Sequence, residues 1–200
     1  MDKSASKAAR TRQFIIETTA GIFNTKGFAG TSMSDLTEAT GLTKGSIYGN
    51  FENKEEVAGA VFDYNHGKVS RMIRQRMDQA VTYYDKLMVY PRVYDQFNRN
   101  TFPLGGCPIL NTSVEADDTN ILLKERAAKA VQKWKKDIQD LIRAGIAHGE
   151  FRKDIDDIRM SLSVIALIEG AIMISKITNS QASLDKIIQT VEILIREMKV

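Results

Sequence analysis

Residues 27–54 read GFAGTSMSDLTEATGLTKGSIYGNFENK, and this stretch carries three signals for the start of a helix in close succession. Ser32 stands three residues before an acidic side chain, which is the spacing of a capping box. Thr43 and Asn53 can each cap a further helix. Gly41 separates the first two, at a point where glycine can adopt the positive φ of a tight turn. The stretch therefore predicts two short helices around a glycine turn, followed by a long helix.

Helices are also predicted on both sides of this stretch. Before it, apolar residues recur near the 3.6-residue period over 7–26, and Gly27 supplies a stop signal. Only 3 Pro and 13 Gly interrupt the 200 residues, which favours helices over the turn-dense pattern of a small β-sandwich. The long helix should run from about residue 53 to 78, and further helices are expected over about 79–100, 107–117, 120–148, 155–178 and 183–199. We therefore expect an all-α fold of about nine helices.

Residue usage argues against several other classes of protein. The single cysteine, Cys107, cannot form an internal disulfide, and one Cys with two His cannot build a metal framework of paired Cys and His ligands. Residues 1–13 are polar and basic, unlike a signal peptide, and the apolar stretch 158–177 carries charged side chains, unlike a lipid-facing helix. Enzyme motifs such as a Gly-rich phosphate loop, HExxH or GxSxG do not occur. We expect a cytoplasmic protein with no catalytic residues, no metal, no cofactor and no membrane contact.

The positions of the charged residues say more about nucleic-acid binding than the net charge does. A net charge of +3 does not by itself indicate binding to nucleic acid. Residues 1–56 carry seven basic and seven acidic side chains, so this part of the chain is balanced. Four of its cations come before and within the first turns of the first predicted helix, where they could meet a phosphate backbone: Lys3, Lys7, Arg10 and Arg12.

An ordered set of residues within about 8–56 resembles the signature of the tetracycline-repressor (TetR) family: Gly27-Phe28, Thr31-Ser32-Met33, Leu36, Ala39, Gly41 to Tyr48, Phe51 and Lys54. The resemblance implies a helix-turn-helix DNA reader over 1–56, whose third helix enters the major groove. It implies a ligand-sensing and dimerisation domain over 57–200. It also implies a homodimer on a pseudo-palindromic operator, usually a repressor that a small molecule releases. Such a dimer must present its two recognition helices about 34–36 Å apart, or a multiple of that distance.

The resemblance assigns DNA contacts to helix starts and to the third helix. Thr31, Ser32 and Lys54 lie at predicted helix starts, which suit phosphate binding. The contacts of the third helix and its cap fall on Thr43, Lys44, Gly45, Ser46 and Tyr48. The chain departs from the family pattern at Gly49-Asn50, where a bulky residue and then His or Tyr are usual. Asn50 could bond adenine or a phosphate instead.

The remaining helices predict a dimer interface and a ligand pocket. Wide apolar faces near the C-terminus fit an isologous four-helix interface, or alternatively an intramolecular core. The residues assigned to the interface are Leu162, Ile165, Ile172, Ile187, Val191 and Ile195. Aromatic and methionine side chains between this region and the reader are typical of an apolar pocket, although they also line ordinary cores. The residues assigned to the pocket are Phe62, Met72, Tyr83, Met88, Tyr94, Phe97, Phe102, Cys107, Trp134 and Met173.

Regulation is expected to pass through the long helix that begins near Asn53. A ligand that prefers the state unable to bind DNA would shift this helix and change the separation of the recognition helices. Cys107 lies in a Gly-Cys-Pro element that resembles one at a helix start in some family members, a position that could support thiol sensing. Most lone cysteines are simply packed. The alternative function is a helical interaction or thiol-sensing module without a small-molecule ligand.

Overall fold

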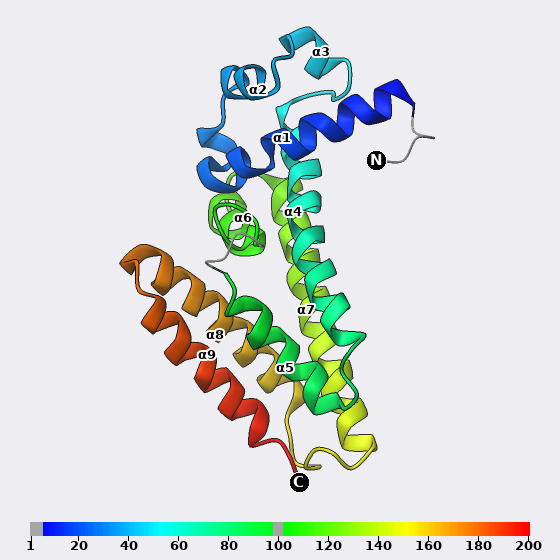
Figure 1. Ribbon diagram of the computed structural model, residues 1–200, viewed down its shortest axis with the longest axis vertical. Helices are drawn as coiled ribbons and strands as arrows, with labels where there is room; N and C mark the ends of the chain where they lie inside the picture. Colours follow the sequence, from blue (N-terminus) through cyan, green and yellow to red (C-terminus); the bar gives the residue numbers. More distant parts are fainter. Residues whose placement is uncertain (1–5, 98–101) are drawn as a thin grey trace. The chain divides into compact units, whose positions relative to one another are not determined.

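The computed structural model describes residues 6–97 and 102–200, and these form nine α-helices joined by turns (Figure 1). The helices are α1 (Lys7–Gly30), α2 (Met33–Thr40), α3 (Lys44–Tyr48), α4 (Lys54–Met77), α5 (Tyr83–Tyr94), α6 (Pro108–Ala116), α7 (Ile121–Ala147), α8 (Asp157–Thr178) and α9 (Gln181–Arg196). Extended pairing within these two ranges is limited to one isolated antiparallel bridge, between Phe151 and Lys199. The predicted all-α class is confirmed.

The chain divides into two compact units, which we call the N-terminal and C-terminal units. The N-terminal unit contains Met1–Lys68 and Pro103–Ala128, and the C-terminal unit contains Val69–Phe102 and Lys129–Val200. The division falls within α4 and again within α7, so each of these helices contributes residues to both units. The expected division after residue 56 differs from this one, because α6 and the start of α7 belong to the same unit as α1.

Predicted capping side chains start three of the helices. The Ser32 hydroxyl accepts a hydrogen bond from the N–H of Asp35 at 3.1 Å, and the Asp35 carboxylate accepts one from the N–H of Ser32 at 2.7 Å, which completes the capping box. The Thr43 hydroxyl caps α3 through the N–H of Ser46, and Asn53 caps α4 in the same way. Gly41 ends α2 with a φ of +67°, so the predicted glycine turn is confirmed.

The predicted stop at Gly27 is confirmed, whereas one other helix boundary was wrong. Gly27 has the non-helical angles φ +74° and ψ 178°, so the helix that begins at Lys7 breaks there, and a short second segment counted within α1 continues to Gly30. The helix expected over 79–100 begins at Tyr83 because Thr82 caps it through the N–H of Asp85, a signal of the same kind as in the capping box of α2. It ends at Tyr94, and positions 98–100 of the expected helix lie outside the described residues.

The core of the N-terminal unit explains how α3 is held. Ile15 of α1, Leu36 of α2 and Ile47 of α3 are fully buried in one apolar cluster, which also includes Phe51. Burying such side chains contributes roughly 1.5–3 kcal/mol each relative to exposing them. This burial fixes one face of the five-residue α3 and leaves its opposite face free.

In the C-terminal unit, α9 packs against both α8 and α5 (Figure 1). Their buried faces include Leu87, Ile168, Ile172 and Leu184. By length and composition α8 could also cross a membrane, with a mean hydropathy of 1.8, but a core helix passes the same test. Its apolar residues supply much of the core of this unit.

Candidate nucleic-acid interface

The exposed face of α3 carries three of the residues predicted to meet DNA. Ile47 is fully buried, whereas Lys44, Gly45 and Tyr48 are exposed. The Lys44 ammonium lies 5.7 Å from the centroid of the Tyr48 ring. An ammonium group, an aromatic hydroxyl and a backbone without a side chain are therefore presented together on this short helix.

Gly45 is not required by the fold. A Cβ placed on it would meet only the Thr43 hydroxyl, at 4.0 Å, and its φ is not positive. Sterics do not require glycine at position 49 either, because a Cβ there would make ordinary van der Waals contacts at 3.4 and 3.5 Å. Glycine costs about 1 kcal/mol of helix propensity relative to alanine, so the fold alone gives no reason for Gly45 on an exposed helix face. Close approach of another molecule to the backbone does give one.

The capping hydroxyls expected at the interface are accessible but already occupied. Ser32 and Thr43 are exposed, and each hydroxyl accepts the N–H of the residue three positions later. Ser46 is half-buried, and its carbonyl accepts a hydrogen bond from the Asn50 amide at 2.9 Å. The amide group of Asn50 therefore already donates one hydrogen bond within the protein, to the backbone of α3.

Two residues predicted to contact DNA, Thr31 and Lys54, use their side chains in hydrogen bonds within the N-terminal unit. Thr31 is fully buried, and its hydroxyl donates to the carbonyl of Gly27 at 2.6 Å. The Lys54 ammonium donates to the carbonyls of Phe28 and Thr31, both at 2.8 Å, and lies 4.1 Å from the centroid of the Phe28 ring. Lys54 thus holds the end of α1 against the start of α4, which is a structural role that the local sequence did not reveal.

Arg12 also makes its contacts within the N-terminal unit. Its guanidinium pairs with Glu56 at 2.7 Å, donates to the carbonyl of Asn50 and lies 3.9 Å above the Phe51 ring. Hydrogen bonds from the backbone of Glu52 and from Arg12 lower the pKa of Glu56. Arg12 therefore links α1 to the residues around the end of α3. Of the other cations predicted to cluster here, Lys7 is exposed, and Lys3 lies outside the described residues.

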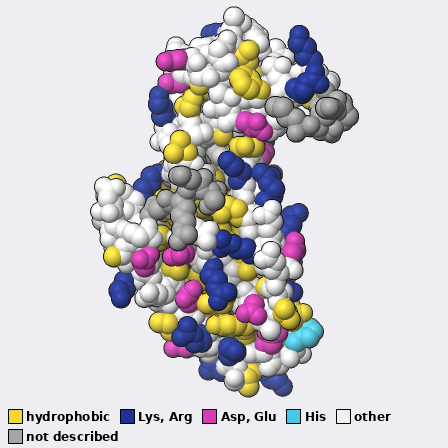
Figure 2. Space-filling model, viewed as in Figure 1, with side chains coloured by type: hydrophobic (Ala, Val, Ile, Leu, Met, Phe, Trp, Pro, Cys, Tyr) yellow, Lys and Arg dark blue, Asp and Glu magenta, His cyan; other side chains and the backbone are white. Residues whose placement is uncertain are grey.

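The start of α2 is tied to α1 by an ion pair. The Lys26 ammonium lies 2.6 Å from the Asp35 carboxylate. Hydrogen bonds from Lys26 and then from Ser32 hold the pKa of Asp35 far below its usual range. The view in Figure 2 shows Lys and Arg side chains interspersed with Asp and Glu, without one dominant basic patch. On this face, attraction for DNA would come from individual cations at particular positions and not from a continuous basic patch.

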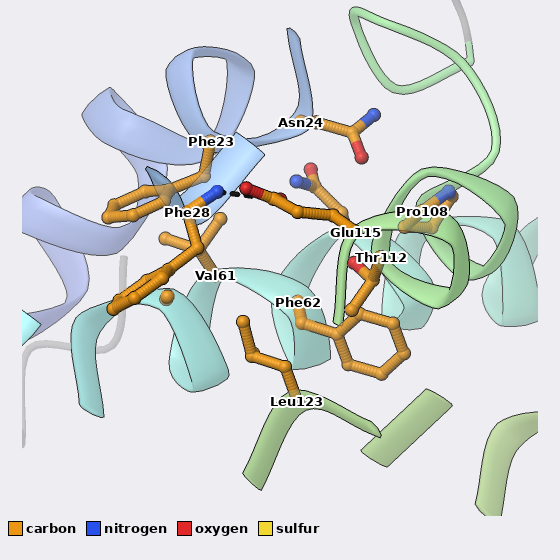
Figure 3. A pocket seen from close by; sticks show the side chains of 11 residues that line it. Phe23, Asn24, Phe28, Val61, Phe62, Pro108, Thr112, Glu115 and Leu123 are labelled. Carbon is orange, nitrogen blue, oxygen red and sulfur yellow. Dashed lines mark hydrogen bonds between the residues drawn. The ribbon is translucent and has the colours of Figure 1, made fainter. Parts of the chain in front are cut away.

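The kink of α1 is held by a carboxylate from α6. Figure 3 shows Glu115 extending toward Phe28, whose N–H it accepts at 2.8 Å, and it also accepts the N–H of Ala29 at 2.7 Å. Gly27 has a φ of +74°, which strains other residues, and a Cβ on it would lie 2.4 Å from this carboxylate, so a substitution would also displace Glu115. The adjoining cavity of about 20 Å³ has room for about one water molecule. Sequence reasoning missed Glu115, because its partners lie 86 and 87 residues away.

A second attachment joins α1 to the turn that precedes α6. The Asn24 amide donates to the carbonyls of Leu104 and Gly106, at 2.8 and 2.9 Å. The Asn111 amide donates back to the carbonyls of Asn24 and Gly105, both at 2.9 Å. These bonds fix α6 on α1 within the N-terminal unit.

The residues predicted to line a ligand pocket fall in several places. Tyr94, Phe97, Phe102 and Trp134 form one buried aromatic cluster in the C-terminal unit. Met88 is buried in α5 and Met72 is half-buried in α4. Three do not fit one pocket with the cluster: Tyr83 packs on the His148 ring, Met173 is exposed, and Phe62 lines the small cavity of the N-terminal unit. Cys107, also in the N-terminal unit, is buried at the start of α6.

Most residues predicted for the dimer interface belong to the core of the protomer. Ile165, Ile172, Val191 and Ile195 are buried within the C-terminal unit, so they are not accessible to a partner. Ile187 is half-buried and Leu162 is exposed. The apolar period of α8 and α9 was recognised, but periodicity alone could not tell the inward face from the outward one. The outward face of α8 instead shows Ile158, Leu162, Met173, Ile174 and Ile177.

A capped pair of short helices around a glycine turn, packed on α1 and with one face of the second helix exposed, is the arrangement of a helix-turn-helix DNA-binding protein. Two family models match the chain: "Bacterial regulatory proteins, tetR family" over residues 15–61 and "Tetracyclin repressor-like, C-terminal domain" over residues 84–191. The chain therefore belongs to the TetR family. It is a DNA-binding transcription regulator and not an enzyme.

Several known proteins are similar over nearly the whole chain. A TetR-family regulator from Cytophaga hutchinsonii has 50% sequence identity and a TM-score of 0.95, and 99% of each chain is covered. A TetR regulator from Chloroflexus aurantiacus has 36% identity and a TM-score of 0.91, with 96% of this chain and 98% of that chain covered. The HTH-type transcriptional repressor DhaR of a Mycobacterium species is 29% identical, covering 90% of this chain and 89% of its own.

Proposed function

We propose that the protein is a cytoplasmic, ligand-responsive repressor that binds a pseudo-palindromic operator as a homodimer and is released by a small molecule. The observation that carries the proposal is the exposed face of α3. Lys44, Gly45 and Tyr48 point away from the core that Ile47 anchors. Lys44 can reach guanine edges or phosphate, Tyr48 can meet a phosphate or a thymine methyl, and Gly45 lets the backbone approach the groove.

The homodimer is supported by the outward face of α8. Ile158, Leu162, Met173 and Ile177 are about half exposed or more, and they recur at helical spacing along one stripe. Gly170 lies on the same helix, and a Cβ placed there would meet nothing within 4 Å. A mid-helix glycine with open space around it is explained if a second helix packs closely against it. We assign this stripe, in place of the buried residues, to the interface between two copies.

The route from effector to DNA follows the connections of the chain. The C-terminal unit joins the N-terminal unit within α4, between residues 102 and 103, and within α7. The second connection leads directly into the turn and helix that hold α1 through Asn24 and Glu115. An effector that moves α4 or α6 would change how α1, and hence α3, is held. The effector must bind the released state more tightly than the DNA-bound state.

The test is a footprint of the full-length protein on the DNA upstream of its own coding sequence. The proposal predicts protection of two half-sites related by two-fold symmetry, with centres about 10 base pairs apart or a multiple of that spacing. It also predicts an even number of protomers per site in native mass spectrometry. A single unsymmetrical footprint bound by one protomer would contradict the homodimer.

A further inference from the structure

The buried aromatic cluster of the C-terminal unit offers flat faces for recognition. The ring centroids of Tyr94 and Trp134 lie 5.1 Å apart and nearly parallel, at 17°. Tyr90 joins the same indole at 6.2 Å, while Phe102 lies 5.7 Å from both Tyr94 and Phe97. All five side chains are at least nine-tenths buried. Such stacked and edge-on pairs suit an aromatic guest as well as each other.

One polar atom in this cluster has no partner. Trp134 is 7% exposed, and its indole Nε1–H, which is fully buried, makes no hydrogen bond with any of the residues that the structure describes. Buried tryptophan N–H groups usually find an acceptor, and an unmet donor is costly. A hydrogen-bond acceptor is therefore the feature that the cluster lacks.

The surroundings of this donor favour a neutral guest. Burial, and secondarily the charge of Asp137, raise the pKa of Tyr90, so a second negative charge is disfavoured beside it. A carbonyl oxygen or an aromatic ring nitrogen meets the donor without an ionic charge.

We propose that the effector is a neutral, flat aromatic molecule that stacks within the cluster of Tyr90, Tyr94, Phe97, Phe102 and Trp134 and accepts a hydrogen bond from Trp134 Nε1–H. This inference rests on the proposed effector-responsive function and specifies its ligand class. Side-chain rotamer changes on binding are common, and one of the rings turns to admit the ligand. Trp134 acts as the specificity-determining donor.

The probes are quinoline and naphthalene, which have nearly the same shape and differ by a ring nitrogen in place of a C–H. Trp134 is the only tryptophan of the chain, so the ¹H–¹⁵N spectrum of the full-length protein contains one indole signal. Quinoline should move that proton signal downfield and bind about five- to tenfold more tightly than naphthalene, as expected for one added hydrogen bond. An unmoved indole signal, or equal affinities, would overturn the proposal.

The matched variant is Trp134→Phe, which keeps an aromatic ring and removes the donor. It should bind both probes with equal affinity, whereas a persistent preference for quinoline would contradict the proposal. The wild-type spectrum gives an answer even if this variant folds poorly. Operator binding is measured separately. If quinoline binds specifically but the protein does not bind DNA, the ligand assignment stands and the repressor function is contradicted. If a small molecule releases the protein from DNA while the indole signal stays unchanged, the repressor function stands and the ligand assignment is contradicted.

Discussion

The carboxylate of Glu115 in α6 accepts the backbone N–H of Phe28 at 2.8 Å, just after α1 kinks at Gly27. Backbone N–H groups at the start of a helical segment have no intrahelical acceptor, and a carboxylate is a favourable partner for them. A side chain at Gly27 would be strained by the φ of +74°, and its Cβ would lie 2.4 Å from this carboxylate and displace it. Glu115 and Gly27 therefore form one joint between α6 and the DNA-reading helices.

Replacing Glu115 by alanine should weaken both the fold and DNA binding. Two N–H groups lose a charged acceptor, that of Phe28 in a partly buried place and that of Ala29 in an exposed one. We expect a loss of about 2 kcal/mol in the free energy of unfolding, measured by urea denaturation. Glu125→Ala is the control, because Glu125 is an exposed carboxylate on α7. Equal stability of the two variants would show that the joint contributes nothing.

Removing the charge of Lys44 should affect DNA binding, whereas removing the charge of Lys54 should affect the stability of the fold. Lys44→Met should flatten the salt dependence of DNA binding by about 2 in log–log slope, since a dimer loses one phosphate contact per protomer. Lys54→Met should leave the slope unchanged and lower the stability instead, because the Lys54 ammonium binds the carbonyls of Phe28 and Thr31. Fluorescence anisotropy at several salt concentrations measures both. A flatter slope for Lys54→Met would show that Lys54 does contact a phosphate.

Gly45→Ala should cost DNA affinity without harming the fold. A Cβ at this position has room in the free protein, and the change should raise stability by up to about 1 kcal/mol. We expect affinity for the operator to fall roughly tenfold, equivalent to about 1.4 kcal/mol, because the methyl group faces the groove. Gly49→Ala is the matched comparison and tests whether the end of α3 also approaches DNA. Unchanged affinity in Gly45→Ala would remove this face of α3 from the interface.

The capping box of α2 should make a pH-dependent contribution to stability. The pKa of Asp35 is lowered by hydrogen bonds from Lys26 and Ser32, so its contribution is complete above the unfolded value of about 3.9 and is lost as pH falls toward the lower folded value. The stability difference between wild type and Asp35→Asn should stay constant from pH 7 to about pH 5 and shrink below about pH 4. Urea midpoints measured across this range provide the test. A difference that shrinks near neutral pH would contradict the assignment.

Gly170→Leu should separate the dimer. The added side chain has open space in the protomer, so folding should be preserved, but it would block close packing of a second α8. We expect sedimentation to show monomers at concentrations where the wild type is dimeric. Ala128→Leu, an exposed change on α7, is the control and should remain dimeric. Dimers of unchanged stability in Gly170→Leu would place the interface elsewhere.

Local signals made most of the fold predictable. The Ser32 and Thr43 caps and the Gly41 turn depend on neighbours within a few residues, and all three are present. The face of α3 was also predictable, because Ile47 had to be buried for the pair of short helices to pack. Where the same local signal was overlooked, at Thr82, the helix boundary was wrong.

Contacts between distant parts of the chain were not predictable. Lys54 has the residue type of a phosphate contact, and only the fold shows that its ammonium donates to the carbonyls of Phe28 and Thr31, 26 and 23 residues away. Glu115 had no local signal, because its two hydrogen bonds close a loop of more than 80 residues. The same reason separates α8 residues such as Ile165, which are buried, from Leu162, which is exposed on the same helix.

The salt dependence of binding to the DNA upstream of the protein's own coding sequence tests the central claim most directly. The account predicts tight, sequence-specific binding whose log–log slope against salt concentration is on the order of −4 or steeper, from a few cations such as Lys44 in each of two protomers. A slope near zero, or equal affinity for unrelated DNA of the same length, would contradict a DNA-reading role for α3.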